Sequence, residues 1–232
     1  MPDSLFLLPK AIAIPIEGLS TPYPVGRIFC VGRNYAAHAA EMGHEVDREA
    51  PFYFTKSSAN AVLSGATVPF PPGTDNFHHE MELAVAIGKP VFRASQAEAA
   101  DAVYAYGCAL DMTRRDLQIR ERNKQRPWDL GKDLENGAVF GPLMRATDWS
   151  PDDDKRIFLS VNGDVRQDAT LHELIWKIDE IISHLSGYYH LRPGDLIMTG
   201  TPAGVGSVQP GDRLEGAIDG LQPISLTLSE AV

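Results

Sequence analysis

Hydrophobic and polar positions alternate in short runs along the chain, and these runs predict mostly strands. Apolar runs of four to eight residues bounded by glycine or proline are typical of buried strands. Proline and glycine, 17 and 20 residues, punctuate the chain throughout, so we expect short strands to outnumber helices. The expected strands are 27–32, 51–56, 79–88, 106–113, 157–165, 195–200 and 223–229.

Three segments have helical periodicity instead, at 95–107, 113–125 and 170–187. The last places seven leucine and isoleucine residues on one face at helical spacing and ends at a glycine. Each segment opens with a serine or threonine three residues before an acidic residue, the spacing of a capping box. These pairs are Ser95 with Glu98, Thr113 with Asp116 and Thr170 with Glu173.

The strand expected at 79–88 begins with two glutamates, Glu80 and Glu82. Successive strand residues point to opposite faces, so both carboxylates share one face, with Cα atoms about 6.7 Å apart. Burying bare carboxylates is costly unless they are neutralised, paired or bound to a metal. Pairing with arginine or lysine at a sheet edge is the commoner outcome for this short pattern, and a metal site is the alternative.

A third acid, Asp111, ends the apolar run of the next expected strand. Three carboxylates at strand ends would form an all-oxygen site, which selects Mg²⁺, Mn²⁺ or Ca²⁺ over Zn²⁺.

A short helix expected at 34–43 carries His38 and Glu41 on one face, with Asn34 as its N-cap and Gly43 as its stop. A carboxylate beside an imidazole orients the ring and suits a general base that takes a proton from water. A solvated surface pair of the same two residues is the alternative.

Beyond Asp111, Arg115 and Gln118 are three residues apart on one helical face, and an arginine there suits capture of a substrate carboxylate. The basic residues that follow at 120–126 are expected to form a solvated face. Lys132 has no apolar periodicity around it, which usually indicates a surface lysine. The glycine-rich loop at 199–206 could hold an anion on its backbone N–H groups or be a plain connection.

The whole chain of 232 residues suits one large domain, and its net charge of −10 argues against nucleic acid or an anionic membrane as partner. Its two cysteines, Cys30 and Cys108, lie in apolar strands and are expected in the core, with a Cys–His nucleophile as a weak alternative. The N-terminus lacks the basic start of a signal peptide, and no apolar run is long enough to span a membrane. We therefore expect a cytoplasmic protein.

Taken in order, six sequence blocks resemble the fumarylacetoacetate hydrolase family, and more specifically its short bacterial fumarylpyruvate and acylpyruvate hydrolases. The resemblance runs from about Arg27 to the C-terminus. The blocks are "CVGRNYAAHAAEMG", "FHHEMELAVAIGK", "ALDMTRRDLQ", "RPWDLGKD", "VNGDVRQ" and "GDLIMTGTPAGVG".

The resemblance implies a fold, a reaction and a set of site residues. The fold is a mixed, β-rich α+β sandwich roll with a few peripheral helices, in which 27–232 is the catalytic domain and 1–26 an N-terminal extension. The reaction is metal-dependent hydrolysis of the C–C bond of a 3-acylpyruvate, a small diketo acid, by a protein that is commonly a homodimer. The implied metal ligands, for one Mg²⁺ or Mn²⁺ per subunit, are Glu80, Glu82 and Asp111. The implied catalytic residues are His38, Glu41 and Lys132, and the implied substrate-binding residues are Arg115, Gln118 and Thr201.

Other functions fit the same residues. The scaffold could decarboxylate oxaloacetate, which needs no activated water, or isomerise an oxo-dienoate. A non-catalytic diacid-binding protein is a third alternative, against which the complete set of His38, Glu41 and Lys132 argues.

Overall fold

The computed structural model describes residues 11–41 and 48–231, and strands dominate it. The strands are β1 (Ala13–Ile14), β2 (Tyr23–Pro24), β3 (Ile28–Gly32), β4 (Phe52–Lys56), β5 (Ala61–Leu63), β6 (Ala66–Pro69), β7 (Phe77–His79), β8 (Met81–Ile87), β9 (Val103–Asp111), β10 (Thr113–Arg114), β11 (Ala138–Phe140), β12 (Met144–Arg145), β13 (Arg156–Val161), β14 (Asp164–Thr170), β15 (Leu196–Met198), β16 (Gly206–Val208), β17 (Arg213–Ile218) and β18 (Ile224–Ser229). The helices are α1 (Ala36–Glu41), α2 (Gln96–Asp101), α3 (Arg115–Asn123), α4 (Asp129–Lys132), α5 (Ile178–Ser186) and two 3₁₀ turns, η1 (Ser58–Asn60) and η2 (Leu171–Glu173).

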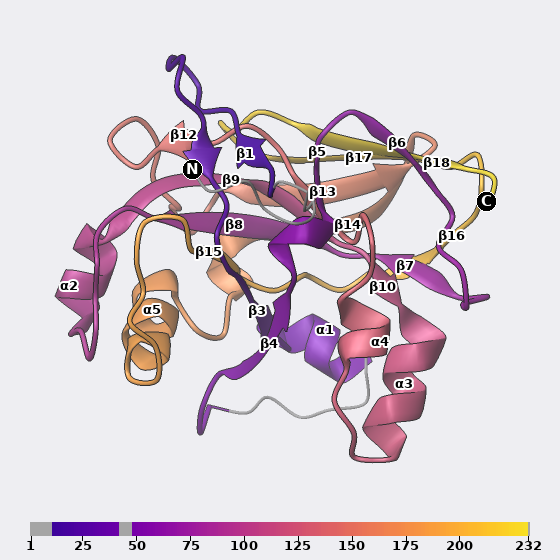
Figure 1. Cartoon of the computed structure of the whole chain (residues 1–232), viewed down its shortest axis with the longest axis horizontal. Coiled ribbons are helices and arrows are strands. Elements are labelled where there is room, and N and C mark those ends of the chain that lie inside the picture. The colour runs from indigo at the N-terminus through magenta and orange to yellow at the C-terminus, as the bar shows by residue number, and fades with distance from the viewer. Residues whose placement is uncertain (1–10, 42–47, 232) are drawn as a thin grey trace, which may run out of the picture.

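Two large sheets form the body of the molecule (Figure 1). An eight-stranded mixed sheet has the order β4-β3-β15-β8-β9-β11-β5, with β12 also paired to β9. A five-stranded sheet has the order β14-β13-β17-β18-β6, and a small sheet has the order β10-β7-β16. Figure 1 also shows two pairs of neighbouring helices, α2 beside α5 and α3 beside α4. Among the described residues, no helix combines the length and apolar content that a membrane crossing requires.

Strand β8 divides the interior into two cores because its side chains alternate between the faces of the large sheet. Met81, Leu83, Val85 and Ile87 join a core shared with the five-stranded sheet, while the alanines between them join a second core on the other face. The predicted alternation is therefore confirmed, and it puts Glu82 on the alanine side.

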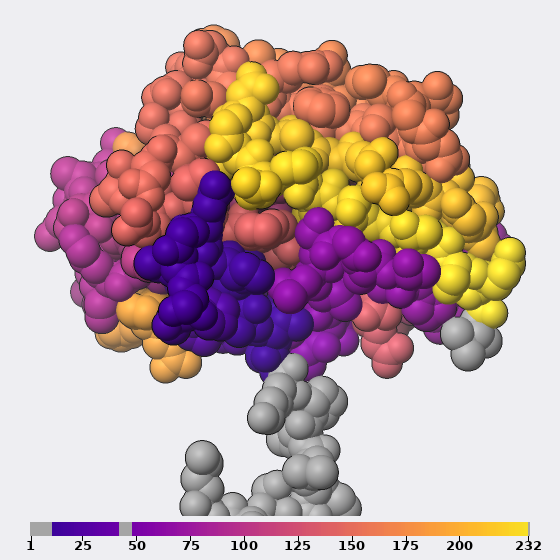
Figure 2. Space-filling model, turned by 90° about the horizontal axis from the view of Figure 1, so that it is seen from above, coloured from indigo at the N-terminus to yellow at the C-terminus, as the bar shows by residue number. Residues whose placement is uncertain are grey.

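Residues 11–26 lie against this second core, where the side chains of Ile14, Ile16 and Tyr23 are buried. Figure 2 shows this indigo segment on the surface next to the yellow C-terminal part of the chain. The hydroxyl of Tyr23 donates to the carbonyl oxygens of Ile87 and Asp195, at 2.8 and 2.9 Å, so the segment is tied to the sheet by polar contacts as well.

Two of the predicted strands are each divided. The segment 79–88 breaks at Glu80: residues 77–79 pair in the small sheet, and β8 begins at Met81. The segment 157–165 is a hairpin of β13 and β14, turned by Asn162 and Gly163 at φ 54° and 89°. Asn-Gly favours the two-residue turn in which both central residues have positive φ. The prediction of one strand at 157–165 was therefore wrong, and the Asn-Gly pair is the sequence signal that indicates the hairpin.

The single helix predicted at 170–187 was also wrong. Its first part is the 3₁₀ turn η2, and α5 begins only at Ile178. Asn34 holds the extended link between them, since its Oδ1 accepts from Trp176 N at 2.7 Å and its carbonyl accepts from Ile175 N at 2.8 Å. Asn34 therefore does not use its side chain as the predicted N-cap of α1. The predicted stop of that helix, Gly43, is outside the described residues.

Candidate active site

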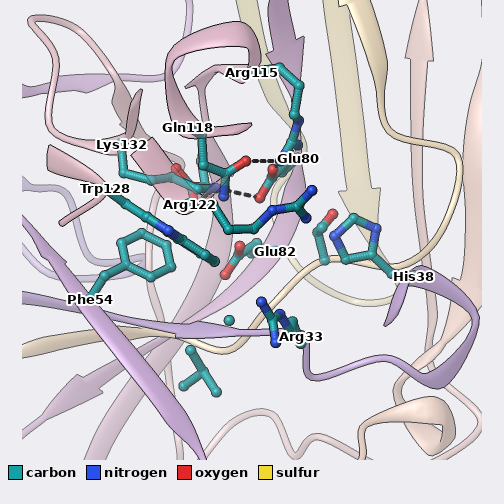
Figure 3. Close-up of a pocket in the computed structure, with 14 residues that line it drawn as sticks. Arg33, His38, Phe54, Glu80, Glu82, Arg115, Gln118, Arg122, Trp128 and Lys132 are labelled. Carbon is teal, nitrogen blue, oxygen red and sulfur yellow. Dashed lines mark hydrogen bonds and ion pairs between the residues drawn. The ribbon is translucent and has the colours of Figure 1, made fainter. Parts of the chain in front are cut away.

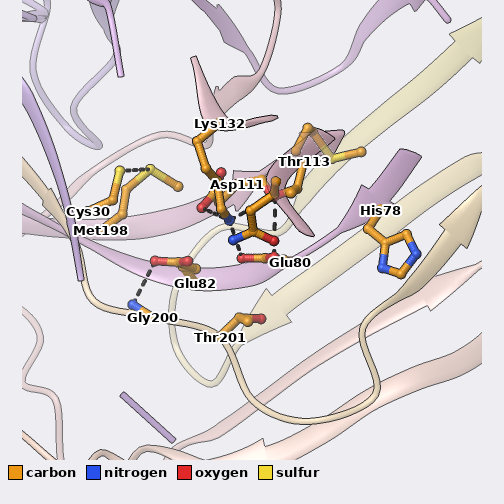
Figure 4. A network of polar contacts seen from close by, with 12 residues as sticks. Cys30, His78, Glu80, Glu82, Asp111, Thr113, Lys132, Met198, Gly200 and Thr201 are labelled. Atoms are coloured by element: carbon orange, nitrogen blue, oxygen red, sulfur yellow. Dashed lines mark hydrogen bonds and ion pairs between the residues drawn. The ribbon is translucent and has the colours of Figure 1, made fainter. Parts of the chain in front are cut away.

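Three carboxylates meet where the large sheet adjoins the small one. Glu80 lies in the break between β7 and β8, Glu82 is in β8, and Asp111 ends β9. Asp111 N donates to Glu80 O at 2.9 Å, which places the strand ends side by side. The side-chain oxygens of all three residues come within 4.8 Å of one another, and each residue is at least 96% buried (Figure 4).

This cluster fits a hard divalent cation. Burial raises the pKa of Glu82 well above its usual range, and the nearby charges of Asp111 and Glu80 raise it further. Asp111 Oδ1 accepts no hydrogen bond from any described residue, although Lys56 Nζ is 2.8 Å away. Three converging carboxylate oxygens are the donor set that Mg²⁺ and Mn²⁺ prefer, and a dication between them would turn their repulsion into attraction.

Cationic side chains also surround the cluster. The carboxylates are therefore paired with lysine and arginine, as one of the two interpretations predicted, and they also fit a metal ion. Lys132 Nζ is 2.8 Å from Glu80 Oε2 and 2.6 Å from Asp111 Oδ2, and the guanidinium of Arg115 pairs with Glu80 Oε1. Burial opposes the ionised form of Glu80, but Lys132 and Arg115 outweigh it and lower the pKa of this carboxyl. Burial likewise opposes the charge of Lys132, and Asp111 and Glu80 outweigh it to raise the lysine pKa.

The surface location expected for Lys132 from its sequence surroundings was wrong, since the residue is 3% exposed. It ends the short helix α4, which packs against α3 at Gly131, where an added Cβ would be 2.7 Å from the Gln118 side chain. The missing side chain at Gly131 lets the two helices approach, and this approach brings Lys132 to the carboxylates.

A second buried lysine, Lys56 at the end of β4, was not predicted. Its Nζ donates to the carbonyl oxygens of Met112 and Gly137, at 3.1 and 3.0 Å, and also to that of Lys132. Lys56 thereby joins three chain segments behind the carboxylates. The signal was the same as for Glu80 and Asp111, a charged residue at the end of an apolar strand.

His38 and Glu41 form a pair across the pocket from the carboxylates. His38 Nδ1 is 3.1 Å from Glu41 Oε2, and the glutamate also accepts from Gly204 N at 3.2 Å. His38 is 6% exposed and lines the pocket, so the alternative of a solvated surface pair was wrong for the histidine. When Nδ1 donates to Glu41, Nε2 carries the lone pair that a base requires.

The glycine-rich loop at 199–206 donates its backbone N–H groups to two carboxyl groups, in line with one of its two interpretations, and both carboxyl groups belong to the protein. Gly200 N donates to Glu82 Oε2 at 2.7 Å, and Gly204 N donates to Glu41. Gly200 has φ 100° and a Cβ there would be 2.8 Å from that of Asn34; at Gly204, with φ 92°, it would be 2.0 Å from Arg166 O. Both positions therefore require glycine.

Thr201, in the same loop, is oriented by a buried glutamine that was not predicted. Gln167 Nε2 donates to Thr201 Oγ1 at 2.7 Å, and Gln167 Oε1 accepts from Met81 N at 2.9 Å. Because the threonine oxygen accepts this bond, its own hydrogen is directed elsewhere. Thr201 lines the pocket, so the hydroxyl can donate to a bound molecule.

Arg115 and Gln118 share a face of α3, as predicted, and Arg115 donates to Gln118 Oε1. The solvated face predicted at 120–126 was wrong at Arg122, which is half-buried and lines the pocket (Figure 3). Arg33 and Trp128 also line it and were not predicted. They are brought there by chain segments far apart in sequence, for which no local pattern exists.

Neither cysteine serves as a nucleophile. Cys30 and Cys108 are fully buried free thiols, and burial raises the pKa of both, to about 12 for Cys108. His79 packs in the interior, with Nδ1 3.2 Å from Gln167 Oε1.

Comparison with known proteins shows what this chain is similar to as a whole. The profile of the family described as "Fumarylacetoacetate (FAA) hydrolase C-terminal" matches residues 27–229. Fumarylpyruvate hydrolase of Ralstonia sp is 51% identical over 192 residues, 82% of this chain and all of the relative. Oxaloacetate tautomerase YcgM of Escherichia coli K12 is 37% identical over 205 residues, 88% of this chain and 93% of the relative. The crystal structure of fumarylpyruvate hydrolase from Pseudomonas aeruginosa in complex with Mn²⁺ and pyruvate superposes with a TM-score of 0.93 at 43% identity, covering 98% of this chain and all of that one.

Proposed function

The chain belongs to the fumarylacetoacetate hydrolase family, and from this premise we propose that it hydrolyses the C–C bond of a 3-acylpyruvate. We take fumarylpyruvate, cleaved to fumarate and pyruvate, as the substrate, because two similar proteins are named fumarylpyruvate hydrolase. The observation that carries the proposal is the convergence of three buried carboxylates with His38 and Lys132 around one pocket.

Glu80, Glu82 and Asp111 would hold one Mg²⁺ or Mn²⁺. When bound, this ion supplies a Lewis acid that polarises the substrate oxygens and orients the diketo acid.

His38 is the proposed base. Its Nε2 takes a proton from water, and Glu41 holds the ring through Nδ1 and stabilises the imidazolium that forms. The water oxygen bonds to the distal keto carbon of the substrate, and the bond from that carbon to C3 of the pyruvate moiety breaks. The electron pair of the broken C–C bond leaves with pyruvate enolate. The proton held by His38 can then be transferred to C3 of the enolate.

Lys132 supports the leaving group, because its positive charge faces the side on which enolate charge develops. Thr201 donates its hydroxyl hydrogen to a substrate oxygen, and Arg115 and Gln118 offer their remaining N–H groups to the pyruvate carboxylate. These roles use polar groups that are already fixed by Glu80, Gln118 and Gln167.

The setting of this activity is part of the proposal. We place it in the cytoplasm, in the degradation of aromatic compounds of the gentisate type, with two copies of the chain forming a homodimer. Residues 27–232 would be the catalytic domain and 1–26 its N-terminal extension, in keeping with the matched range 27–229.

Oxaloacetate is a second candidate substrate, because a relative that is 37% identical is named oxaloacetate tautomerase. Interconversion of its enol and keto forms, its decarboxylation, or isomerisation of an oxo-dienoate would each use the carboxylates without an attacking water.

The test is a spectrophotometric assay of fumarylpyruvate and oxaloacetate side by side, with purified protein in Mn²⁺, in Mg²⁺ and after chelation by EDTA. We expect fumarylpyruvate to be consumed with stoichiometric release of pyruvate, activity to disappear with EDTA, and Mn²⁺ to restore it. Turnover of oxaloacetate without turnover of fumarylpyruvate would contradict the proposed hydrolysis. Full activity after chelation would contradict the metal dependence.

A further inference from the structure

One buried cation, Lys56 at the end of β4, takes no part in the proposed mechanism. The residue is 4% exposed and is not among the described residues that line the pocket, so it does not contact a substrate there. Its Nζ is 2.8 Å from Oδ1 of Asp111, a candidate metal ligand. A lysine is rarely buried unless it is paired with an opposite charge, and Asp111 supplies that charge.

The ammonium of Lys56 donates its hydrogens to the backbone and not to Asp111. An ammonium has three N–H donors. Three carbonyl oxygens accept from Nζ: those of Met112 and Gly137, at 3.1 and 3.0 Å, and that of Lys132. Asp111 Oδ1 accepts no hydrogen bond from any described residue, in spite of its short distance from Nζ. Lys56 therefore balances the charge of Asp111 and leaves the lone pairs of Oδ1 available.

The other oxygen of Asp111 is bound in a different way. Lys132 Nζ donates to Asp111 Oδ2 at 2.6 Å. The two remaining hydrogens of this ammonium are taken by Glu80 Oε2 and Thr113 Oγ1, each at 2.8 Å (Figure 4). Asp111 thus lies between two ammonium groups, of which one donates to it and the other does not. Oδ1 is therefore the oxygen of this carboxylate that is open to a metal ion.

The carbonyls that bind Lys56 belong to segments that carry the site. Met112 directly follows β9, and Lys132 ends α4. One ammonium therefore fixes the backbone next to a candidate metal ligand and that of the proposed catalytic lysine. A separate contact joins the same regions, since Ser57 N donates to Asp133 Oδ1 at 2.8 Å. This contact does not involve the Lys56 side chain, so it can hold the two segments together when that side chain is replaced.

We propose that Lys56 is a positioning residue of the metal centre, which presents Asp111 Oδ1 to the ion by balancing its charge without donating to it. Groups that lie behind metal ligands orient them and influence metal affinity. A neutral, apolar residue in place of Lys56 would leave three carbonyls without this donor and would leave Asp111 held at Oδ2 only. The inference rests on the proposed metal site and adds to it a residue outside the pocket.

Calorimetric titration of Mn²⁺ into wild type and into the Lys56→Met variant tests this role. Methionine is similar in length but has neither charge nor N–H donor. We expect Mn²⁺ affinity to fall by about 10–100-fold, and the electron paramagnetic resonance spectrum of the bound ion to change. The direction is diagnostic, because the loss of a positive charge alone would strengthen binding of a cation. Lys89→Met, which removes an exposed lysine paired with Asp101, is the matched control and should keep the wild-type affinity.

Unchanged or stronger Mn²⁺ binding by a folded Lys56→Met variant would overturn the inference, because the lysine would then support only the fold. Circular dichroism and urea unfolding without metal verify that the variant is folded and measure any loss of stability separately. If Lys56→Met does not fold, Lys56→Gln is titrated instead, since its amide keeps two N–H donors for the carbonyls without the charge. Weaker Mn²⁺ binding is again expected, and unchanged or stronger binding again overturns the inference.

These measurements use no substrate, so a failure of the proposed hydrolysis is distinguishable from a failure of this inference. A wild type that binds Mn²⁺ but does not cleave fumarylpyruvate would contradict the proposed function, and the titrations would still decide the role of Lys56. A wild type that binds no Mn²⁺ would contradict both the proposed metal site and the inference.

Discussion

Glu80 and Glu82 are two residues apart, and their surroundings differ. Glu80 is paired with Lys132 and Arg115, and its pKa is low; Glu82 accepts one backbone N–H, and burial beside two other acids raises its pKa. A carboxylate whose charge is opposed by its surroundings gains most from a bound cation. The asymmetry therefore points to Glu82 as the residue whose ionisation depends most on the metal.

His38→Ala tests the proposed base at the scale of a single residue. General-base assistance contributes roughly 10²–10⁴-fold to rate, so kcat on fumarylpyruvate should fall by at least about 100-fold. Affinity for Mn²⁺, measured by calorimetry, should stay within about threefold of wild type because His38 is not part of the carboxylate cluster. His172→Ala, on an exposed histidine, is the control. A kcat within threefold of wild type would remove His38 from the mechanism.

At this scale, the sequence predicts the residues that carry a local signature and misses those that do not. Two acids at the start of one strand and one at the end of the next were visible from the apolar runs around them. Gln167 and Arg33 reach the site from segments with no such spacing, whereas Lys56 carried the same signal as the acids at the end of its apolar strand and was overlooked. The contacts of these residues depend on how the strands are ordered in the sheets, which a linear pattern does not specify.

Among the elements, the loop at 199–206 and helix α3 hold the polar groups of the site in place. The loop fixes Glu82 and Glu41 through the N–H groups of Gly200 and Gly204. Helix α3 is fixed at its start by Asp116, which accepts from Thr74 Oγ1 at 2.5 Å and from Leu117 N at 2.9 Å. Asp116 was predicted to form a capping box with Thr113, but Thr113 instead accepts a hydrogen bond from Lys132.

Asp116→Asn tests this anchor and its dependence on pH. Burial opposes ionisation of Asp116, but hydrogen bonds from Thr74 and from the N–H groups of Leu117 and Asp75 lower its pKa below 3.8. A carboxyl whose folded pKa is depressed stabilises the fold above its unfolded pKa, and that contribution is lost as pH falls below about 3.8. The variant should lose about 1 kcal/mol of unfolding free energy at pH 7, and the difference should shrink at pH 3.

Urea unfolding of wild type and variant at both pH values measures this difference. Asp154→Asn, in an exposed turn, is the control for removal of one carboxylate. An equal destabilisation by Asp116→Asn at pH 7 and pH 3 would show that ionisation of Asp116 is not what stabilises the start of α3.

The errors at element scale have tertiary causes. Residues 170–177 have helical periodicity, yet Asn34 binds Ile175 and Trp176 in an extended link before α5. The strand at 79–88 breaks at Glu80 because its first part pairs with a different sheet. Periodicity predicts which side chains are buried, as at Leu171 and Leu174, and long-range hydrogen bonds decide the backbone conformation.

At the scale of the whole molecule, the fold assembles the candidate site at the boundary between the large sheet and the small one. The family fold expected from the ordered motifs is confirmed by the superposition at a TM-score of 0.93. The large sheet and the five-stranded sheet enclose one core, and residues 11–26 cover part of the opposite face of the large sheet. The carboxylates lie where β8 and β9 leave the large sheet toward the small one, and α3 and α4 bring Arg115 and Lys132 to them.

The most direct test of the central claim is anomalous diffraction from crystals of the protein soaked in Mn²⁺. The account predicts one strong anomalous peak per chain, with oxygens of Glu80, Glu82 and Asp111 each within roughly 2.0–2.6 Å, the range for hard cations, and its loss in crystals of Glu82→Gln. A wild-type map with no peak among these three carboxylates would contradict the account.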